Sequence, residues 1–179
     1  CRAVKESLST TTTAELTAHL PGGPVSVCLT RAELDRAIRP LWPEARLSGV
    51  AVPVVIVADT SEPELPYDGE LTALDGLRPG DVPLFVVGAG VQCASWGELF
   101  SCAALGRGAT GVVVDGCVRD AAAITALGFP TFARGLSPLD TFARAVVTDI
   151  DVEARAGGVD VRPLDGLAGF SNFGASSVD

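Results

Sequence analysis

The sequence predicts an α/β fold built on parallel strands, and two observations carry this prediction. Residues 112–114 are three consecutive valines, a β-branched run typical of a strand that is buried on both faces. Earlier in the chain, residues 84–87 form a second apolar strand, followed by a Gly-Ala-Gly turn at 88–90 and a helical pattern over 94–105. This alternation favours adjacent parallel strands whose carboxyl ends meet at one edge of the sheet.

An arginine and an aspartate follow the valine strand. We expect the strand to stop at Asp115-Gly116, so that the chain turns and places Arg119 and Asp120 at the start of the next helix. Glu98 precedes Arg119 by the length of one helix and one returning strand. Because α/β proteins bind ligands at the carboxyl ends of their strands, the three side chains are predicted to share one pocket.

Capping and turn signals predict the remaining elements. The Ser/Thr run over 9–13 offers N-caps for a helix over 14–20, and Thr30 forms a capping box with Glu33 for a helix over 31–38. We further expect, in chain order, a strand over 47–59 bent at Pro53 and so at an edge or bulge, a short helix over 71–77, a turn over 78–81, a strand over 129–133, a hairpin within 150–161, and a tail over 167–179 that is a loop or disordered.

Composition excludes several functional classes. A length of 179 residues favours one domain, residues 1–179, that is large enough to bury a core. The formal charge of −9 argues against a nucleic acid or an anionic membrane as partner, and no apolar run reaches membrane-spanning length. The only lysine is Lys5 and the only histidine is His19, which disfavours Schiff-base chemistry, a multi-histidine metal site and a Ser-His-Asp triad. Any metal is therefore expected to be a hard ion held by carboxylates and water.

The five cysteines show no CxxC spacing. They favour a reducing cytoplasm with mostly buried thiols, and a nucleophilic role for Cys93 or Cys117 lacks a histidine partner. The chain has no methionine, not even an initiator, so we expect that it begins at a processing boundary or lacks its start, rather than being a mature lipoprotein that begins at Cys1.

Arg119, Asp120 and Glu98 together offer the groups that bind a 2-oxo acid. Arg119 presents a planar fork for a carboxylate and a positive charge near a developing enolate. Asp120 can anchor Mg²⁺ or Mn²⁺, which keeps several waters and polarises a keto oxygen, and Glu98 can hold one of those waters. The plainer alternative is that Arg119 and Asp120 form only a structural ion pair.

The expected helix start beside Glu98 offers a second group of anion-binding donors. Backbone amides at the beginning of a helix are free to bind a carboxylate. The residues predicted to bind the substrate carboxylate in this way are Ala94, Ser95, Trp96 and Gly97.

These residues lie within a longer similarity. From about Ile38 to Asp165 the sequence resembles the RraA-like family, which includes class II 4-hydroxy-4-methyl-2-oxoglutarate and 4-carboxy-4-hydroxy-2-oxoadipate aldolases and proteins once labelled demethylmenaquinone methyltransferases. The matching segments are IRPLWPEARLSGVAV, RPGDVPLFVVGAG, ASWGELFSCAALGRGATGVVVDGCVRD, GFPTFARGLSP and GGVDVRP. An acidic residue, twenty residues and then Arg-Asp is that family's aldolase signature, and Glu98, Arg119 and Asp120 satisfy it.

The resemblance implies a single β-rich domain of the swivelling β/β/α type that assembles as a homotrimeric ring or a hexamer, with active sites at subunit interfaces. It also implies that Asp120 ligates the divalent metal, that Arg119 contacts the pyruvyl group and that Glu98 supports a metal-bound water. The tail over 166–179 and the segment around His19 differ from the usual family pattern.

Two functions follow from this resemblance as hypotheses. The first is a metal-dependent aldolase that cleaves a 4-hydroxy-2-oxo diacid to release pyruvate, with oxaloacetate decarboxylation as a side activity. The second is a non-catalytic relative that binds a protein partner, as in the branch of the family that inhibits ribonuclease E.

Overall fold

The computed structural model describes residues 13–20, 23–30, 37–170 and 174–178. The chain divides into two compact units, Cys1–Ala37 and Ile38–Asp179. In the first unit, strands β1 (Thr13–Leu20) and β2 (Gly23–Thr30) form an antiparallel hairpin. The described part of the second unit contains a large sheet, a small two-stranded sheet and three helices.

The β1–β2 hairpin shows that the helix predicted over 14–20 is wrong. The strand register pairs Ala14 with Leu29, Leu16 with Val27, and Ala18 with Val25. Small and apolar residues thus oppose each other at every second position, and this alternation outweighs the local capping signal. The helix predicted over 31–38 falls almost wholly outside the described residues.

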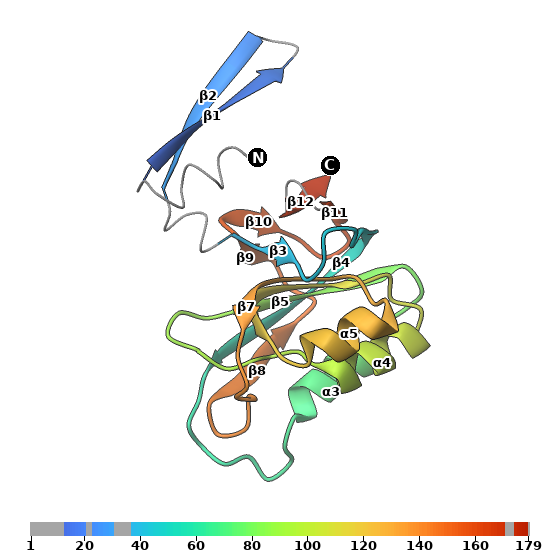
Figure 1. The fold of residues 1–179 in the computed structure, drawn as a ribbon. Helices are drawn as coiled ribbons and strands as arrows, with labels where there is room; N and C mark the ends of the chain where they lie inside the picture. Colours follow the sequence, from blue (N-terminus) through green and yellow to red (C-terminus); the bar gives the residue numbers. More distant parts are fainter. Residues whose placement is uncertain (1–12, 21–22, 31–36, 171–173, 179) are drawn as a thin grey trace. The chain divides into compact units, whose positions relative to one another are not determined.

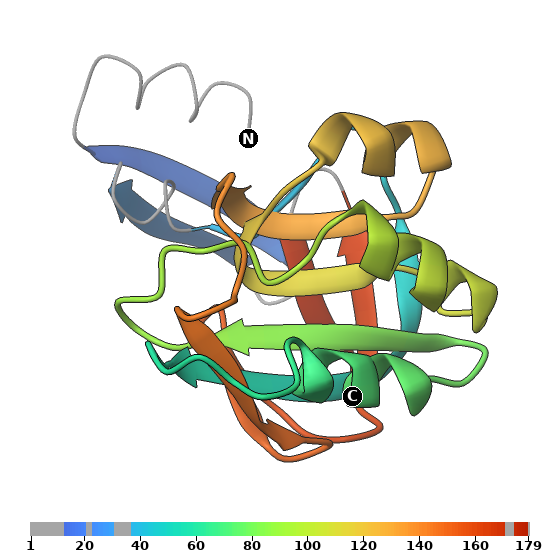
Figure 2. The same cartoon turned by 90° about the horizontal axis from the view of Figure 1, so that it is seen from below.

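The second unit is organised by four parallel strands. They lie in the order β4 (Leu47–Ala58), β5 (Asp81–Val87), β6 (Val112–Val118) and β7 (Thr131–Leu136) and run side by side in Figure 2, coloured from teal to orange. Each crossover carries one helix: α3 (Asp68–Asp75), α4 (Glu98–Gly106) and α5 (Ala121–Leu127). The predicted alternation of strand, turn and helix is therefore confirmed.

Shorter strands extend this sheet at both sides. β3 (Arg39–Pro40) pairs with β7, while β8 (Ala145–Ile150) and β11 (Gly166–Phe170) both pair antiparallel with β4. β12 (Gly174–Val178) pairs antiparallel with β11. The predicted hairpin within 150–161 is also present, as β9 (Ala154–Ala156) and β10 (Val159–Val161), and it forms the small separate sheet.

Two apolar clusters cover the two faces of the large sheet. On one face, residues of the three helices pack against Phe85, Val112 and Val114. On the other face, Val113 and Phe132 pack with residues of the β9–β10 hairpin and of β11. Figure 1 shows the three helices grouped together, with β9 and β10 on the opposite side of the strands. This layering leaves the carboxyl ends of β5 and β6, and the loops that follow them, to build a site.

Pro53 was predicted to lie at an edge or a bulge of its strand, and the edge alternative is wrong because β4 is an inner strand. A register irregularity does occur nearby, between Val55 and Ile56 in the pairing with β8. Pro53 itself falls where the outer partner of β4 changes from β11 to β8, so that its missing amide leaves no gap in either pairing. The tail is not a loop throughout, because residues 166–170 form β11 and Leu167 is buried against β4. Both results depend on pairing with distant segments.

β6 also continues past Asp115-Gly116, where the sequence predicted its end. The buried Asp115 carboxylate accepts hydrogen bonds from Arg134 Nε and from the Gly157 amide, the latter at 2.7 Å, so it belongs to the fold rather than to a turn. At Gly116 a Cβ atom would lie 2.6 Å from Val87 Cγ2 on β5. A glycine is therefore needed here for the two strands to approach, and β6 extends to Val118, the residue before Arg119.

No helix within the described residues is long and apolar enough to cross a membrane.

Candidate active site

Arg119 and Asp120 lie between the end of β6 and the start of α5. The Arg119 amide donates a hydrogen bond of 2.9 Å to the Trp96 carbonyl oxygen, which ties this turn to the segment before α4. Asp120 is the N-cap residue of α5 and has left-handed backbone angles, φ 56° and ψ 33°. Among non-glycine residues, aspartate and asparagine adopt this conformation most readily. Its side chain makes no capping bond, so the carboxylate is free for other partners.

The Asp120 carboxylate reaches the neighbouring helix instead. Asp120 Oδ2 accepts a hydrogen bond of 3.2 Å from the amide of Glu98, the first residue of α4. Gly97 makes this approach possible, since a Cβ atom there would lie 2.8 Å from Asp120 Oδ2 and 3.1 Å from Arg119 Cγ. The structure thus brings Glu98, Arg119 and Asp120 together, although the Glu98 side chain itself points to solvent without an ion pair among the described residues.

The Arg119 guanidinium lies between two carboxylates. Its Nε is 3.7 Å from Asp120 Oδ2, and its Nη1 is 4.0 Å from Asp140 Oδ2. The three side chains are between 31% and 43% exposed, so solvent partly screens these attractions. Both distances exceed that of a hydrogen bond, so the N–H donors remain available to a ligand.

A small cavity of about 110 Å³ opens beside Arg119. Its lining includes all four residues predicted to bind a substrate carboxylate: Ala94, Ser95, Trp96 and Gly97. A wider, more open depression of about 370 Å³ is lined by Arg119 and Asp120 together with Leu136 and Pro138. Arg119 therefore borders both spaces.

Two of the four amides that were predicted to be free for a ligand already donate hydrogen bonds to the backbone. α4 begins at Glu98 and not at residue 94, because residues 94 and 117 form a β-bridge. The amide of Ala94 donates to the Leu139 carbonyl at 2.7 Å, and that of Ser95 to the Cys117 carbonyl at 3.1 Å. Within the described part of the chain, the amides of Trp96 and Gly97 are the two of the four that have no such partner.

The side chains of this segment are buried. Trp96 is 1% exposed, and its Nε1 donates to Ser101 Oγ at 2.8 Å while its ring packs edge-on against Phe85. It anchors the segment in the core, and only its backbone is suited to contact a ligand. The Ser95 hydroxyl is also buried and has no hydrogen-bond partner among the described residues.

Tyr67 and Asp140 also line this candidate site, and neither was predicted from the sequence. The Tyr67 hydroxyl donates to Asp140 Oδ2 at 2.9 Å, and both residues line the cavity beside Arg119. Burial, and then the hydrogen bond and negative charge of Asp140, raise the pKa of Tyr67, so its phenol stays protonated at neutral pH. Tyr67 is the only tyrosine of the chain, and Asp140 is the only acidic residue between Asp120 and Asp149. The uniqueness of this tyrosine and the isolation of this acidic residue are the only features of the sequence that could have pointed to them.

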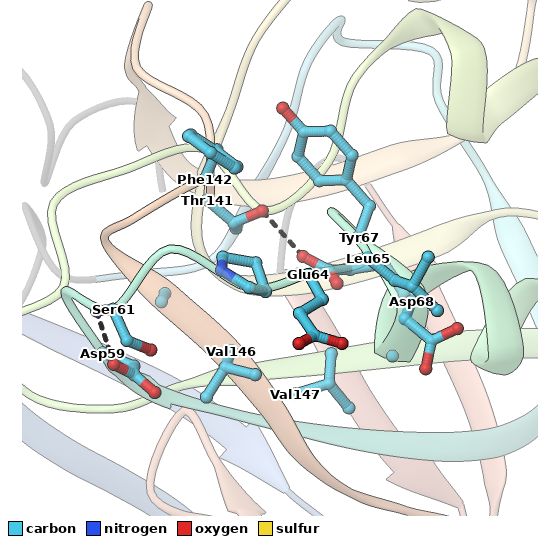
Figure 3. A pocket seen from close by; sticks show the side chains of 14 residues that line it. Asp59, Ser61, Glu64, Leu65, Tyr67, Asp68, Thr141, Phe142, Val146 and Val147 are labelled. Atoms are coloured by element: carbon cyan, nitrogen blue, oxygen red, sulfur yellow. Dashed lines mark hydrogen bonds between the residues drawn. The ribbon is translucent and has the colours of Figure 1, made fainter.

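An acidic cavity of about 360 Å³ adjoins the Arg119 cavity, because Tyr67 and Thr141 line both. Thr141 donates a hydrogen bond of 2.7 Å to Glu70 Oε1, drawn as a dashed line in Figure 3. No lysine, arginine or histidine is among the lining residues, whereas four carboxylates are: Asp59, Glu64, Asp68 and Glu70. Tyr67 therefore separates a strongly acidic space from one that contains the Arg119 cation.

The cysteines near the site are weak candidates for nucleophiles. Cys93 is buried, and burial raises the pKa of its thiol, which disfavours the reactive thiolate. Cys117 is half-buried in β6 and Cys102 is exposed on α4, so of the three cysteines whose burial the structure describes only Cys93 meets the expectation of mostly buried thiols.

The described residues contain no cluster of three or more His, Cys, Asp or Glu side chains suited to a metal. A hard divalent ion that keeps most of its waters needs only one or two carboxylates. Asp120 meets this need, since Oδ2 is occupied by the Glu98 amide while no hydrogen bond or ion pair within the described residues uses Oδ1. The donor set therefore fits a largely hydrated Mg²⁺ or Mn²⁺.

Known proteins resemble this chain in both sequence and fold. Residues 13–169 match the RraA-like family (Aldolase/RraA). The chain is 33% identical over 92 residues to an Aromatoleum aromaticum protein and 37% identical over 101 residues to a Halalkalibacterium halodurans protein, each named "Putative 4-hydroxy-4-methyl-2-oxoglutarate aldolase". These matches cover 51% and 55% of this chain and 57% and 47% of the relatives, so the chain spans about half the length of the curated relatives it matches.

Among solved structures, the fold is similar to that of Streptomyces coelicolor RraAS2, described as an unusual member of the RNase ES inhibitor RraA protein family. The TM-score is 0.69 at 24% sequence identity, and the match covers 79% of this chain and 69% of that one. The order of strands around Arg119 and Asp120, the match over residues 13–169 and this shared fold agree, and the chain belongs to the RraA-like family.

Proposed function

We propose that this protein is a divalent-metal-dependent aldolase that cleaves a 4-hydroxy-2-oxo diacid to release pyruvate, with oxaloacetate decarboxylation as a side activity. The observation that carries the proposal is the meeting of Arg119, Asp120 and the start of α4 at the carboxyl ends of β5 and β6. The names of the two relatives support the same reaction class. Both reactions pass through a pyruvate enolate, so one set of residues can serve both.

Arg119 is the residue that we propose binds the substrate. Its N–H donors are not used in hydrogen bonds to Asp120 or Asp140, and it borders the cavity lined by the backbone of residues 94–97. A planar guanidinium can hold the carboxylate of a 2-oxo acid with two parallel bonds. The amides of Trp96 and Gly97 are placed to share that carboxylate, and Arg119 then lies next to the enolate charge that develops.

Asp120 is the residue that we propose holds the metal, through Oδ1, with Glu98 bonded to one of the waters around it. When bound there, a divalent ion would polarise the keto oxygen of the substrate. Asp120 has two tasks in this arrangement, because its Oδ2 also fixes the first turn of α4 through the Glu98 amide.

A second subunit is proposed to complete the site. Asp120 and Arg119 are 43% and 39% exposed, and the depression beyond them is open to solvent. A retro-aldol site works best when water is excluded, because electrostatic stabilisation of the enolate weakens in water. A homotrimer or hexamer with sites between subunits would provide this closure, and sedimentation that showed only monomer at micromolar concentration would oppose it.

The competing function is a non-catalytic relative that binds a protein partner. It is favoured by the structural likeness to a member of the RNase ES inhibitor family and by the small number of protein ligands that the described residues offer to a metal. Such a protein has no need of a divalent-ion site at Asp120.

One experiment separates the two functions. Purified protein is titrated with Mn²⁺ and then assayed for pyruvate release from oxaloacetate and from 4-hydroxy-4-methyl-2-oxoglutarate. The aldolase proposal expects saturable Mn²⁺ binding that Asp120→Ala abolishes, together with pyruvate release that requires the metal. Metal-independent background rates and no saturable binding would favour the non-catalytic function.

A further inference from the structure

Asp140 is the centre of a polar cluster that has no part in the metal and substrate binding proposed above. Its Oδ2 accepts the Tyr67 hydroxyl at 2.9 Å and faces Arg119 Nη1 at 4.0 Å. Its Oδ1 accepts a hydrogen bond of 3.2 Å from Arg144 Nη1. Both carboxylate oxygens therefore have a cationic neighbour, and the carboxylate has little freedom to rotate.

This placement constrains the direction in which Arg119 points. Asp120 attracts the guanidinium at Nε, and Asp140 attracts it at Nη1, a different edge of the same plane. Two attractions on different edges oppose rotation of the plane, yet neither takes up an N–H donor at these distances. A carboxylate ligand then meets a guanidinium that is already oriented, which lowers the cost of forming two parallel bonds.

Tyr67 holds the other side of Asp140. It is the N-cap residue of α3 and has φ 63° and ψ 17°, a left-handed conformation that is unusual for a bulky side chain. Such a backbone persists only where the surroundings hold it in place, and strained residues of this kind gather at ligand sites. The hydrogen bond to Asp140 joins this residue to a loop 73 positions further along the chain.

We propose that Asp140 is a positioning residue for Arg119, and that Tyr67 fixes Asp140, so that the guanidinium receives a 2-oxo acid carboxylate in one orientation. The proposal rests on the function proposed above, because it assigns Arg119 a carboxylate ligand. It adds two residues, outside the Glu98, Arg119 and Asp120 signature, on which substrate affinity depends.

The first test compares three variants in the metal-loaded protein. Asp140→Asn keeps the shape of the side chain but removes the charge that faces Arg119, and Tyr67→Phe removes only the hydroxyl. We expect Asp140→Asn to lower kcat/KM for oxaloacetate roughly ten- to a hundredfold, the range for a group that orients another functional residue, and Tyr67→Phe to lower it less. Asp149→Asn is the matched control, because Asp149 is an exposed carboxylate on β8 that lines neither cavity.

The second measurement is independent of turnover. Oxalate is a planar dicarboxylate that resembles the pyruvate enolate, and its affinity reports on Arg119 once Mn²⁺ affinity, measured in parallel, is known to be unchanged. We expect calorimetry to show that oxalate binds most tightly to wild type, less tightly to Tyr67→Phe and least tightly to Asp140→Asn. The affinity for Mn²⁺ should be the same in all three. A merely structural role would lower the melting temperature without moving oxalate affinity in the folded protein.

The third measurement uses Tyr67 itself, since the phenolate absorbance of a chain with one tyrosine reports on one residue. Burial raises the pKa of Tyr67 most, the hydrogen bond and charge of Asp140 raise it further, Arg119 lowers it, and Glu70 adds a smaller rise. Asp140→Asn removes a negative charge and should move the phenol titration to lower pH. This shift tests the contact between Tyr67 and Asp140 without any substrate.

The outcomes distinguish the two proposals. If wild type releases pyruvate and Asp140→Asn and Tyr67→Phe match it in kcat/KM and oxalate affinity, the positioning role is overturned and the aldolase remains. If wild type neither releases pyruvate nor binds oxalate, the aldolase proposal fails and the positioning role fails with it. Should Asp140→Asn not fold, Tyr67→Phe carries the test, because it preserves the ring and all of its apolar contacts.

Discussion

Asp120 Oδ2 and the Glu98 amide are 3.2 Å apart, a hydrogen bond that joins the residue before α5 to the first residue of α4. Two parallel strands that end at the same edge are thus linked at the level of their following helices. One oxygen of Asp120 is committed to the fold and the other is left for a ligand. Substitutions at Asp120 can therefore be designed to change one task and keep the other.

Asp120→Asn should weaken metal binding strongly without unfolding the protein. Asparagine adopts the left-handed conformation readily and its amide oxygen can still accept the Glu98 hydrogen bond, so the melting temperature should hardly change. A neutral amide is a poor ligand for a hard cation, so Mn²⁺ affinity and turnover should fall together, by more than about tenfold. Isothermal titration with Mn²⁺ checks this. Equal affinity in wild type and variant would rule out Asp120 as the ligand.

Arg119→Lys should separate substrate binding from metal binding. A lysine ammonium keeps the positive charge but cannot form two parallel bonds to a carboxylate. Losing one charge-assisted hydrogen bond of about 1.5–3 kcal/mol corresponds to a fall in kcat/KM of roughly ten- to a hundredfold, with Mn²⁺ affinity retained. If Arg119 and Asp120 formed only a surface ion pair, worth about 0–1 kcal/mol, the same change would leave activity almost intact. Steady-state kinetics with oxaloacetate decide between these results.

Glu98→Gln should give an intermediate loss. The Glu98 side chain is exposed and its proposed link to the metal runs through water, whereas its backbone amide, which binds Asp120, is unchanged by the substitution. We expect a smaller fall in Mn²⁺ affinity and turnover than in Asp120→Asn, because an outer-shell group orients a ligand without replacing it. A variant as inactive as Asp120→Asn would instead indicate that Glu98 binds the metal directly.

The sequence predicted the parts of the site that follow regular elements. Glu98, Arg119 and Asp120 each stand where a helix begins after a parallel strand, so strand and helix lengths alone place them at one edge. Tyr67 and Asp140 lie in loops without periodicity, and their contact joins segments 73 residues apart. No local pattern encodes such a contact.

Two errors in the fold predicted from the sequence have the same cause. The segment 14–20 carries both a helix cap and an alternating pattern, and only its partner β2 decides in favour of a strand. The tail contains glycine and alanine at most positions of β11, so its alternation is weak, and its strand exists because β4 offers an open edge over Leu47–Val50. Where a segment needs a distant partner to define its state, local propensity is a weak predictor.

Gly97→Ala tests whether the close approach of the two helix starts is essential. Gly97 has an extended backbone, φ −156° and ψ −171°, so alanine fits the backbone without strain. Its Cβ atom, however, would lie 2.8 Å from Asp120 Oδ2 and 3.2 Å from Arg119 Nε, and must displace both functional groups. Gly106→Ala in the last turn of the same helix is the matched control, because a Cβ atom there meets nothing within 4 Å.

The two glycine variants should differ in activity far more than in stability. Gly106→Ala should keep full activity and gain up to about 1 kcal/mol of unfolding free energy, because alanine restricts the unfolded chain. Gly97→Ala should lose Mn²⁺ affinity and turnover together, since one displaced carboxylate serves both the metal and the α4 amide. Parallel Mn²⁺ titrations, kinetics and thermal melts of the two variants provide the comparison. A Gly97→Ala protein with wild-type affinity and turnover would show that the Asp120 and Arg119 side chains can be displaced without loss of function. The active site proposed from their positions beside Gly97 would then be wrong.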